Sequence, residues 1–194
     1  MSLAEAAADR RRSGRGRDLA LFVAWLVVLG LCLHYGRSLA PYLEDRGGRG
    51  GLLLLGLGAL AALGYGAWRI RALAPERRRA GFLAGLGSAA GLYLLERLQP
   101  LMIERLHLVL YGVLALLAFR LWGHWRRGLA RTAWAGAVCV LVGTLDEVVQ
   151  YFHPQRVGDP ADVATNAAAS LLVLVALHYL EGPGATGPAA GKTL

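Results

Sequence analysis

The sequence predicts an all-α protein, a polytopic transmembrane bundle of six helices. Hydrophobic residues make up 56% of the 194 residues and charged residues only 18%, which is low for a soluble protein. The apolar residues gather into six runs, each close to the ~20 residues that a helix needs to cross a bilayer. Inside a bilayer the backbone must satisfy its own hydrogen bonds, which favours helices. A soluble bundle would show polar stripes at helical period, and these runs show almost none.

Three spans are expected in residues 19–95, after a basic tail of residues 1–18. They are Leu19–Tyr35, Leu52–Trp68 and Ala80–Leu95. The first resembles a signal peptide, but its apolar run is longer than a usual signal core, so we interpret it as an uncleaved helix. In the third, the glycines from Gly81 to Gly91 have the small-xxx-small spacing that lets helices approach closely.

Three further spans are expected in residues 96–181. They are Leu106–Trp122, Thr132–Phe152 and Val163–Leu180, and the second of these becomes polar after Leu145. Residues 182–194 are rich in Gly, Pro and Ala, which predicts a disordered tail.

The basic residues predict the orientation of the spans. If the N-terminus is cytoplasmic, 15 of the 21 Lys and Arg residues lie inside and 6 outside. This bias favours a multi-pass plasma-membrane protein with both termini in the cytoplasm. Each basic cluster begins or ends an apolar run instead of forming one face with interleaved aromatics, which argues against nucleic acid as a partner. The two cysteines, Cys32 and Cys139, lack zinc spacing, so a cysteine metal site is not expected. No other metal or cofactor is expected.

Polar residues gather at the predicted outer ends of the last three spans. Glu104 and His107 are three apart and share one face of the fourth span. On the fifth span, Gln150 lies four residues after Asp146 and three after Glu147, so it can neighbour either acid. The adjacent acids point about 100° apart, and Glu147 is the one expected to face the bundle.

The following loop and sixth span add the other half of this cluster. Arg156 lies in the short loop, and Asp159-Pro160 opens the last helix, with Asp159 as the expected N-cap. Asp162 and Asn166 are four apart and share a face. The expected ligand-binding residues are therefore Glu104, His107, Asp146, Glu147, Gln150, Arg156, Asp162 and Asn166.

These residues resemble the pattern of the VanZ-like family, membrane proteins named for a protein associated with teicoplanin resistance. That pattern has an acidic residue and a His at the start of one span. After it come an Asp-Glu-x-x-Gln, then an Arg in the next loop, and then an Asp-x-x-x-Asn that enters the next helix. The matching residues are Glu104 and His107; Asp146, Glu147 and Gln150; Arg156; and Asp162 and Asn166, within roughly Leu95 to Leu180.

The resemblance implies a protein of the bacterial cell envelope with a polar pocket on its outer side. Membrane lipids are the expected surroundings, and the expected ligand is an anionic lipid or a cell-wall precursor. The expected effect is on susceptibility to glycopeptides such as teicoplanin. Arg156 suits an anionic head group, but an ion pair with Asp162 or Glu147 explains it as well.

Three alternatives stay open for the sequence alone. An intramembrane enzyme acting on a lipid-linked substrate would use Glu147 or His107 in acid–base chemistry, although His107 is equally well explained as a satisfied interfacial histidine. A small transporter would bury ionisable residues near the midplane. A structural or partner-binding protein would use the polar cluster only to lock its helical hairpins. The oligomeric state does not follow from the sequence.

Overall fold

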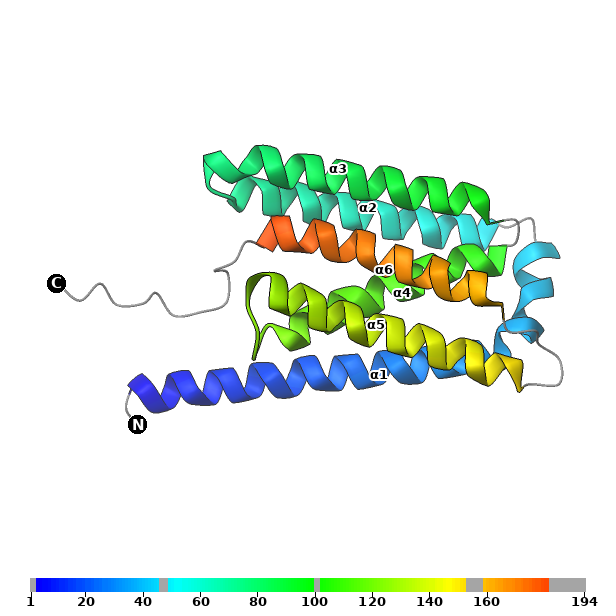
Figure 1. Ribbon diagram of the computed structural model, residues 1–194, viewed down its shortest axis with the longest axis horizontal. Coiled ribbons are helices and arrows are strands. Elements are labelled where there is room, and N and C mark those ends of the chain that lie inside the picture. The colour runs from blue at the N-terminus through cyan, green and yellow to red at the C-terminus, as the bar shows by residue number, and fades with distance from the viewer. Residues whose placement is uncertain (1–2, 46–48, 100–101, 153–158, 182–194) are drawn as a thin grey trace.

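The fold is a bundle of long helices. The computed structural model describes residues 3–45, 49–99, 102–152 and 159–181. Within these ranges it has six helices and no strand: α1 (Leu3–Asp45), α2 (Arg49–Ala72), α3 (Pro75–Leu98), α4 (Met102–Trp122), α5 (Gly128–Tyr151) and α6 (Pro160–Glu181). The predicted all-α class and the six helices are confirmed, and Figure 1 shows their side-by-side arrangement.

Each predicted apolar run falls within one helix, except that the fifth run ends at Phe152, one residue after the end of α5. The helices extend beyond the runs, most of all α1, which begins at Leu3 and therefore includes the basic residues before Leu19. Alanine and arginine are good helix formers in water, so a helix can continue past its apolar part. By length and composition, four segments of the described helices qualify as membrane spans: Arg12–Gly36, Glu104–Trp122, Gly128–Tyr151 and Pro160–Glu181.

Successive helices run in opposite directions, so the bundle has two chemically different ends. The start of α1, the α2–α3 and α4–α5 turns and the end of α6 lie together at one end (Figure 1). We name this the basic end, after the arginines between Arg69 and Arg79 and between Arg120 and Arg131. The opposite end, where α4 and α6 begin and α5 finishes, is named the acidic end after Glu104, Asp146, Glu147, Asp159 and Asp162.

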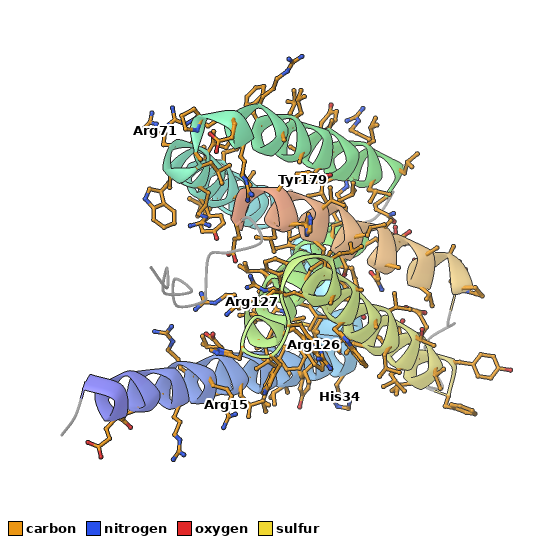
Figure 2. The ribbon with its side chains drawn as sticks, turned by 60° about the vertical axis from the view of Figure 1, so that its left-hand side comes forward. Arg15, His34, Arg71, Arg126, Arg127 and Tyr179 are labelled. Atoms are coloured by element: carbon orange, nitrogen blue, oxygen red, sulfur yellow. The ribbon has the colours of Figure 1, made fainter. Side chains whose placement is uncertain are left out.

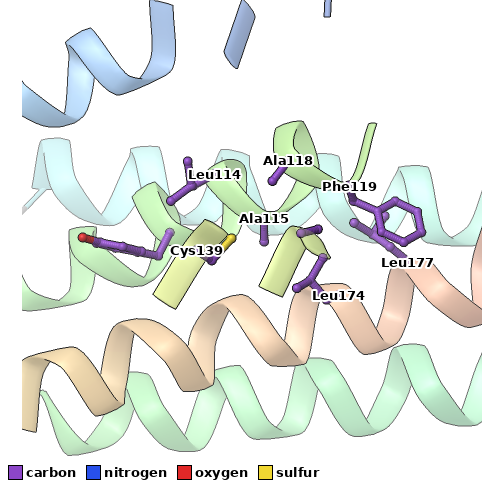
Figure 3. Packing of buried hydrophobic residues seen from close by; sticks show 9 residues of the cluster. Leu114, Ala115, Ala118, Phe119, Cys139, Leu174 and Leu177 are labelled. Carbon is purple, nitrogen blue, oxygen red and sulfur yellow. The ribbon is translucent and has the colours of Figure 1, made fainter. Parts of the chain in front are cut away.

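The core lies where α4, α5 and α6 meet. Tyr111 and Leu114 on α4 and Leu174 on α6 are completely buried. Small residues such as Ala135 on α5 and Ala115 on α4 (Figure 3) let these helices approach closely. α6 packs against α3, α4 and α5, whereas α1 packs against α4. This arrangement brings three polar helix ends together at the acidic end.

The helices outside this core present apolar side chains outward. Leu57, Leu60 and Leu63 on α2 and Leu83 and Leu86 on α3 are all more than half exposed. Such extensive exposed apolar surface marks a protein that contacts a membrane or a partner.

The predicted close approach through glycines occurs at two positions of α3. An ideal Cβ placed on Gly81 would lie 2.7 Å from Leu73 Cδ1, and one on Gly91 would lie 2.8 Å from Leu172 Cδ2. Both glycines therefore leave room for neighbouring leucines, one in the α2–α3 turn and one on α6. Gly85 and Gly87 have no such neighbour within 4 Å among the described residues.

Candidate functional site

The α5–α6 hairpin is joined at the acidic end by Glu147. This residue is only 6% exposed. Its Oε1 accepts a hydrogen bond from Gln150 Nε2 at 3.1 Å, and its Oε2 accepts one from the backbone N–H of Asp159 at 3.0 Å. Glu147 faces the bundle as expected, and both of its oxygens already have donors.

Asp159 caps the first turn of α6. Its Oδ1 accepts the N–H of Ala161 at 2.8 Å, and its backbone carbonyl accepts the N–H of Asp162 at 2.9 Å. Pro160 occupies the first helical position, where its missing N–H costs nothing. The expected N-cap is confirmed. Together with Glu147, it fixes the direction in which α6 presents Asp162 and Asn166.

Tyr111 is a site residue that the sequence pattern did not single out. Its ring is completely buried, and its hydroxyl donates to Asp146 Oδ2 at 2.9 Å. Asp146 therefore also points toward a neighbouring helix, although only Glu147 was expected to do so. A signal was available, because Tyr111 follows His107 by four residues and Glu104 by seven, which places all three on one helix face.

Asn166 lies one layer deeper than the rim carboxylates. It follows Pro160 by six residues, so it lies about 9 Å along α6 from the start of the helix. An ideal Cβ on Gly143 would be 3.6 Å from Asn166 Cβ and 3.4 Å from Tyr111 Cε1, so these three residues meet. Asn166 is 2% exposed, and among the described residues its Nδ2 has no hydrogen-bond partner.

Glu104, His107 and Asp162 complete the cluster and are all partly exposed. His107 on α4 lies near Asp162 on α6. The neighbouring Arg105 has a different role, because it contacts Glu96 Oε1 at 3.1 Å and donates to the carbonyl of Gln99 at 3.1 Å. It thus fastens the start of α4 to the end of α3.

Seven of the eight expected ligand-binding residues lie on described helices, and α4, α5 and α6 contribute all of them. The eighth, Arg156, lies outside the described residues, as do the predicted disordered residues 182–194. We name the polar residues gathered at this end the acidic cluster: Glu104, His107, Tyr111, Asp146, Glu147, Gln150, Asp159, Asp162 and Asn166.

The acidic cluster is rich in hydrogen-bond acceptors. Within the described part of the chain it has five carboxylates and one histidine, His107, while the neighbouring Arg105 pairs with Glu96. Ionised carboxylates only accept hydrogen bonds, so the cluster suits groups that donate them, such as hydroxyls and amines. No set of three or more His, Cys, Asp or Glu side chains among the described residues is arranged to hold a metal ion.

The comparisons with known proteins identify one family. Residues 92–180 match the family model VanZ/LLP1, a stretch that runs from the last part of α3 to the end of α6 and contains the whole acidic cluster. No curated protein and no solved structure matches the chain.

Proposed function

Because residues 92–180 place this chain in the VanZ-like family, we propose that it binds a lipid-linked cell-wall precursor at the outer surface of the plasma membrane. In this proposal all six helices span the membrane and both termini are cytoplasmic. The acidic cluster then faces outward and receives the polar head of the precursor. By holding that molecule, the protein alters susceptibility to teicoplanin-type glycopeptides.

The distribution of charge supports this orientation. Arginines concentrate at the basic end, which the positive-inside rule places in the cytoplasm, and the acidic cluster occupies the opposite end (Figure 1). Ionisable groups at the rim of a bundle meet lipid head groups. A transporter would instead hold them near the midplane, between broken helices.

The composition of the acidic cluster supports a ligand that carries sugar hydroxyls. An anionic head group alone suits Arg156, but the described residues offer five carboxylates, which repel a bare anion. A lipid-linked glycan carries hydroxyl and amide donors beside its anionic phosphate, and partly exposed carboxylates such as that of Asp162 can accept them. Such a ligand therefore fits the cluster better than a simple anionic phospholipid does.

The observation that carries the proposal is the buried amide of Asn166. Fastening hairpins does not require an unpaired donor, and an unsatisfied buried polar group costs about 1–3 kcal/mol. Asn166 Nδ2 is enclosed and has no partner among the described residues. If the neighbouring side chains move, Asn166 Nδ2 can donate a hydrogen bond to an acceptor oxygen of a ligand. This hydrogen bond would offset the cost of burying the amide.

Binding measurements with the full-length protein in nanodiscs test the proposal. A polyprenyl-pyrophosphate-linked disaccharide peptide should bind, and the same polyprenyl pyrophosphate without sugars should bind at least about tenfold more weakly, since each lost hydrogen bond costs about 1 kcal/mol or more. Asp162→Asn should weaken the first interaction, whereas Asp9→Asn, the same change at an exposed residue near the start of α1, should not. Equal binding of both lipids would contradict recognition of the glycan.

A cellular assay tests the consequence of binding. Cells that express the wild-type protein should differ in teicoplanin susceptibility from cells with Asp162→Asn at equal protein levels. If the precursor binds in vitro and susceptibility does not change, the binding site stands and the antibiotic effect is abandoned.

A further inference from the structure

Two acids at the basic end, the buried Asp18 and the partly buried Glu181, are paired with donors inside the protein. Asp18 on α1 accepts a hydrogen bond from Arg120 Nη2 at 3.0 Å and contacts His124 Nε2 at 3.0 Å. Glu181 on α6 accepts hydrogen bonds from Arg131 Nη1 at 2.9 Å and from the hydroxyl of Tyr65 at 3.0 Å. These two carboxylates are therefore committed to internal partners.

The outward-facing charge at the same end is predominantly positive. Its exposed acids are few among the described side chains, namely Glu5, Asp9 and Glu76. The exposed arginines form a larger group: Arg12, Arg15, Arg17, Arg71, Arg77, Arg78, Arg79, Arg126 and Arg127. Figure 2, which brings this end forward, shows Arg126 and Arg127 at the α4–α5 turn, Arg15 on the neighbouring α1, and Arg71 apart from them.

Exposed indole rings lie in the α4–α5 turn and in the second turn of α5. Trp125 is 49% exposed and Trp134 47%, and Trp122 stacks on Trp134 with ring centroids 5.1 Å apart. The guanidinium of Arg15 lies 5.9 Å from the centroid of the Trp125 ring. Tryptophan is enriched at the level of lipid head groups, so in a membrane this contact would hold Arg15 at the depth of the lipid phosphates.

We propose that Arg15, Arg126 and Arg127, with Trp125, bind the phosphate of an anionic phospholipid in the leaflet at the basic end. α1 is held beside the turn by Asp18, and an ideal Cβ on Gly14 would lie 3.9 Å from His124 Cε1. The three arginines thus come from two segments that the fold keeps together. Guanidinium groups pair well with phosphate oxygens, and the exposed rings contact the acyl-chain boundary.

A membrane lipid is favoured over a nucleic acid by the surroundings of these residues. The arginines border helices with exposed leucines and valines, such as Leu129 and Val23, and a phosphodiester backbone would gain nothing from this apolar surface. This inference shares with the proposed function only the placement of the helices in a membrane. It concerns a different leaflet and different residues.

Titration of the purified full-length protein in detergent with phosphatidylglycerol and phosphatidylcholine, followed by native mass spectrometry, tests the site. Phosphatidylglycerol should bind more tightly, because each basic residue that pairs with its phosphate strengthens the attraction roughly fivefold. The triple variant Arg15→Gln, Arg126→Gln, Arg127→Gln should weaken phosphatidylglycerol binding by at least about tenfold. Binding of phosphatidylcholine should be unchanged.

The matched control removes the same charge from the same end of the bundle. Arg71→Gln, Arg77→Gln, Arg79→Gln changes three exposed arginines around the α2–α3 turn and should weaken phosphatidylglycerol binding less than about threefold. If the two triple variants lost the same affinity for phosphatidylglycerol, binding would depend on the total positive charge of this end, and the proposed site would be wrong.

Two soluble competitors separate the remaining sources of phosphate. Full displacement of phosphatidylglycerol by millimolar inorganic phosphate would overturn the lipid assignment, as would tighter binding of a labelled oligonucleotide. Binding of the precursor at the acidic end is measured separately. Either proposal can therefore fail while the other stands.

Discussion

Glu147 on α5 accepts the backbone N–H of Asp159 at the start of α6, with 3.0 Å between Oε2 and the nitrogen. Its second oxygen accepts Gln150 Nε2 at 3.1 Å. A carboxylate can accept both hydrogen bonds, whereas an amide offers a single oxygen. The residue that the sequence suggested as a catalytic acid or base therefore fastens the hairpin that carries Asp162 and Asn166.

Glu147→Gln is expected to destabilise the protein by about 1–3 kcal/mol. The new amide must present its NH2 group to one of the two N–H donors, which leaves that donor unsatisfied. Unfolding in detergent, followed by circular dichroism, measures the loss. Glu76→Gln is the control, since it makes the same chemical change at an exposed residue of α3 and should alter stability little. Unchanged stability of Glu147→Gln would show that the hairpin does not depend on the carboxylate.

Tyr111→Phe is expected to cost about 1–2 kcal/mol of stability. The substitution keeps the buried ring and removes the hydroxyl that donates to Asp146 Oδ2 at 2.9 Å. A double-mutant cycle with Asp146→Ala should give a coupling energy of at least about 0.5 kcal/mol. Additive losses in the double variant would mean that the pair does not interact.

Arg131→Met is expected to be among the most destabilising changes, at about 3–5 kcal/mol. Arg131 is buried, its Nε donates to the carbonyl of Phe119 at 2.6 Å, and its guanidinium carbon lies 3.7 Å from the centre of the Phe119 ring. Removal of the guanidinium leaves Glu181 without its cationic partner and with the hydroxyl of Tyr65 as a remaining donor. Arg131→Lys should recover little, because an ammonium cannot reproduce the planar contact with Phe119 and Glu181 together. Thermal unfolding of both variants checks this order, and full rescue by Lys would contradict it.

Most of the fold could be predicted because hydropathy reports it directly. The runs Leu52–Trp68 and Leu106–Trp122 fall within α2 and α4 since membrane-length apolar runs have few alternatives to a helix. The extension of α1 back to Leu3 could not be predicted in this way. A helix that continues into water through Arg and Ala carries no hydropathy signal, so only the backbone shows where it begins.

The candidate site could be predicted only where its residues interact locally. Asp159 as N-cap and the pairing of Gln150 with Glu147 follow from spacing along the chain. The contact of Tyr111 with Asp146 joins residues 35 apart in sequence, and it depends on how α4 packs against α5. A tyrosine in an apolar run has the pattern of a core or interface residue, so the sequence gives no sign of the partner of its hydroxyl.

The proposed orientation predicts opposite accessibility of the two ends. In a variant without Cys32 and Cys139, a cysteine at Glu76 in the first turn of α3 should react with a membrane-impermeant reagent only after the cytoplasmic side is opened. A cysteine at Ala161 in the first turn of α6 should react in intact cells. Both side chains are exposed, so accessibility depends on the side of the membrane. The same reactivity at both positions would rule out the alternating arrangement of six spans.

Asn166→Leu is expected to separate ligand binding from stability. The Nδ2 group is buried without a partner among the described residues, so its replacement by an apolar side chain of similar volume removes an unsatisfied donor. Stability in detergent should therefore stay the same or rise by about 1 kcal/mol. Binding of the glycan-bearing precursor should fall by about tenfold or more, because one hydrogen bond to the ligand is lost.

Gly143→Ala provides a second route to the same distinction. An ideal Cβ at this position is 3.4 Å from Tyr111 Cε1 and 3.8 Å from its hydroxyl oxygen, which is ordinary contact, and alanine favours the helix by about 1 kcal/mol. The variant should fold at least as well as the wild type while its methyl group occupies the space beside Asn166. Weaker precursor binding in both variants, with stability retained, supports a ligand at this amide. A loss of stability in Asn166→Leu would instead show that the amide has a structural partner, and the cluster would then serve only to fasten α4, α5 and α6.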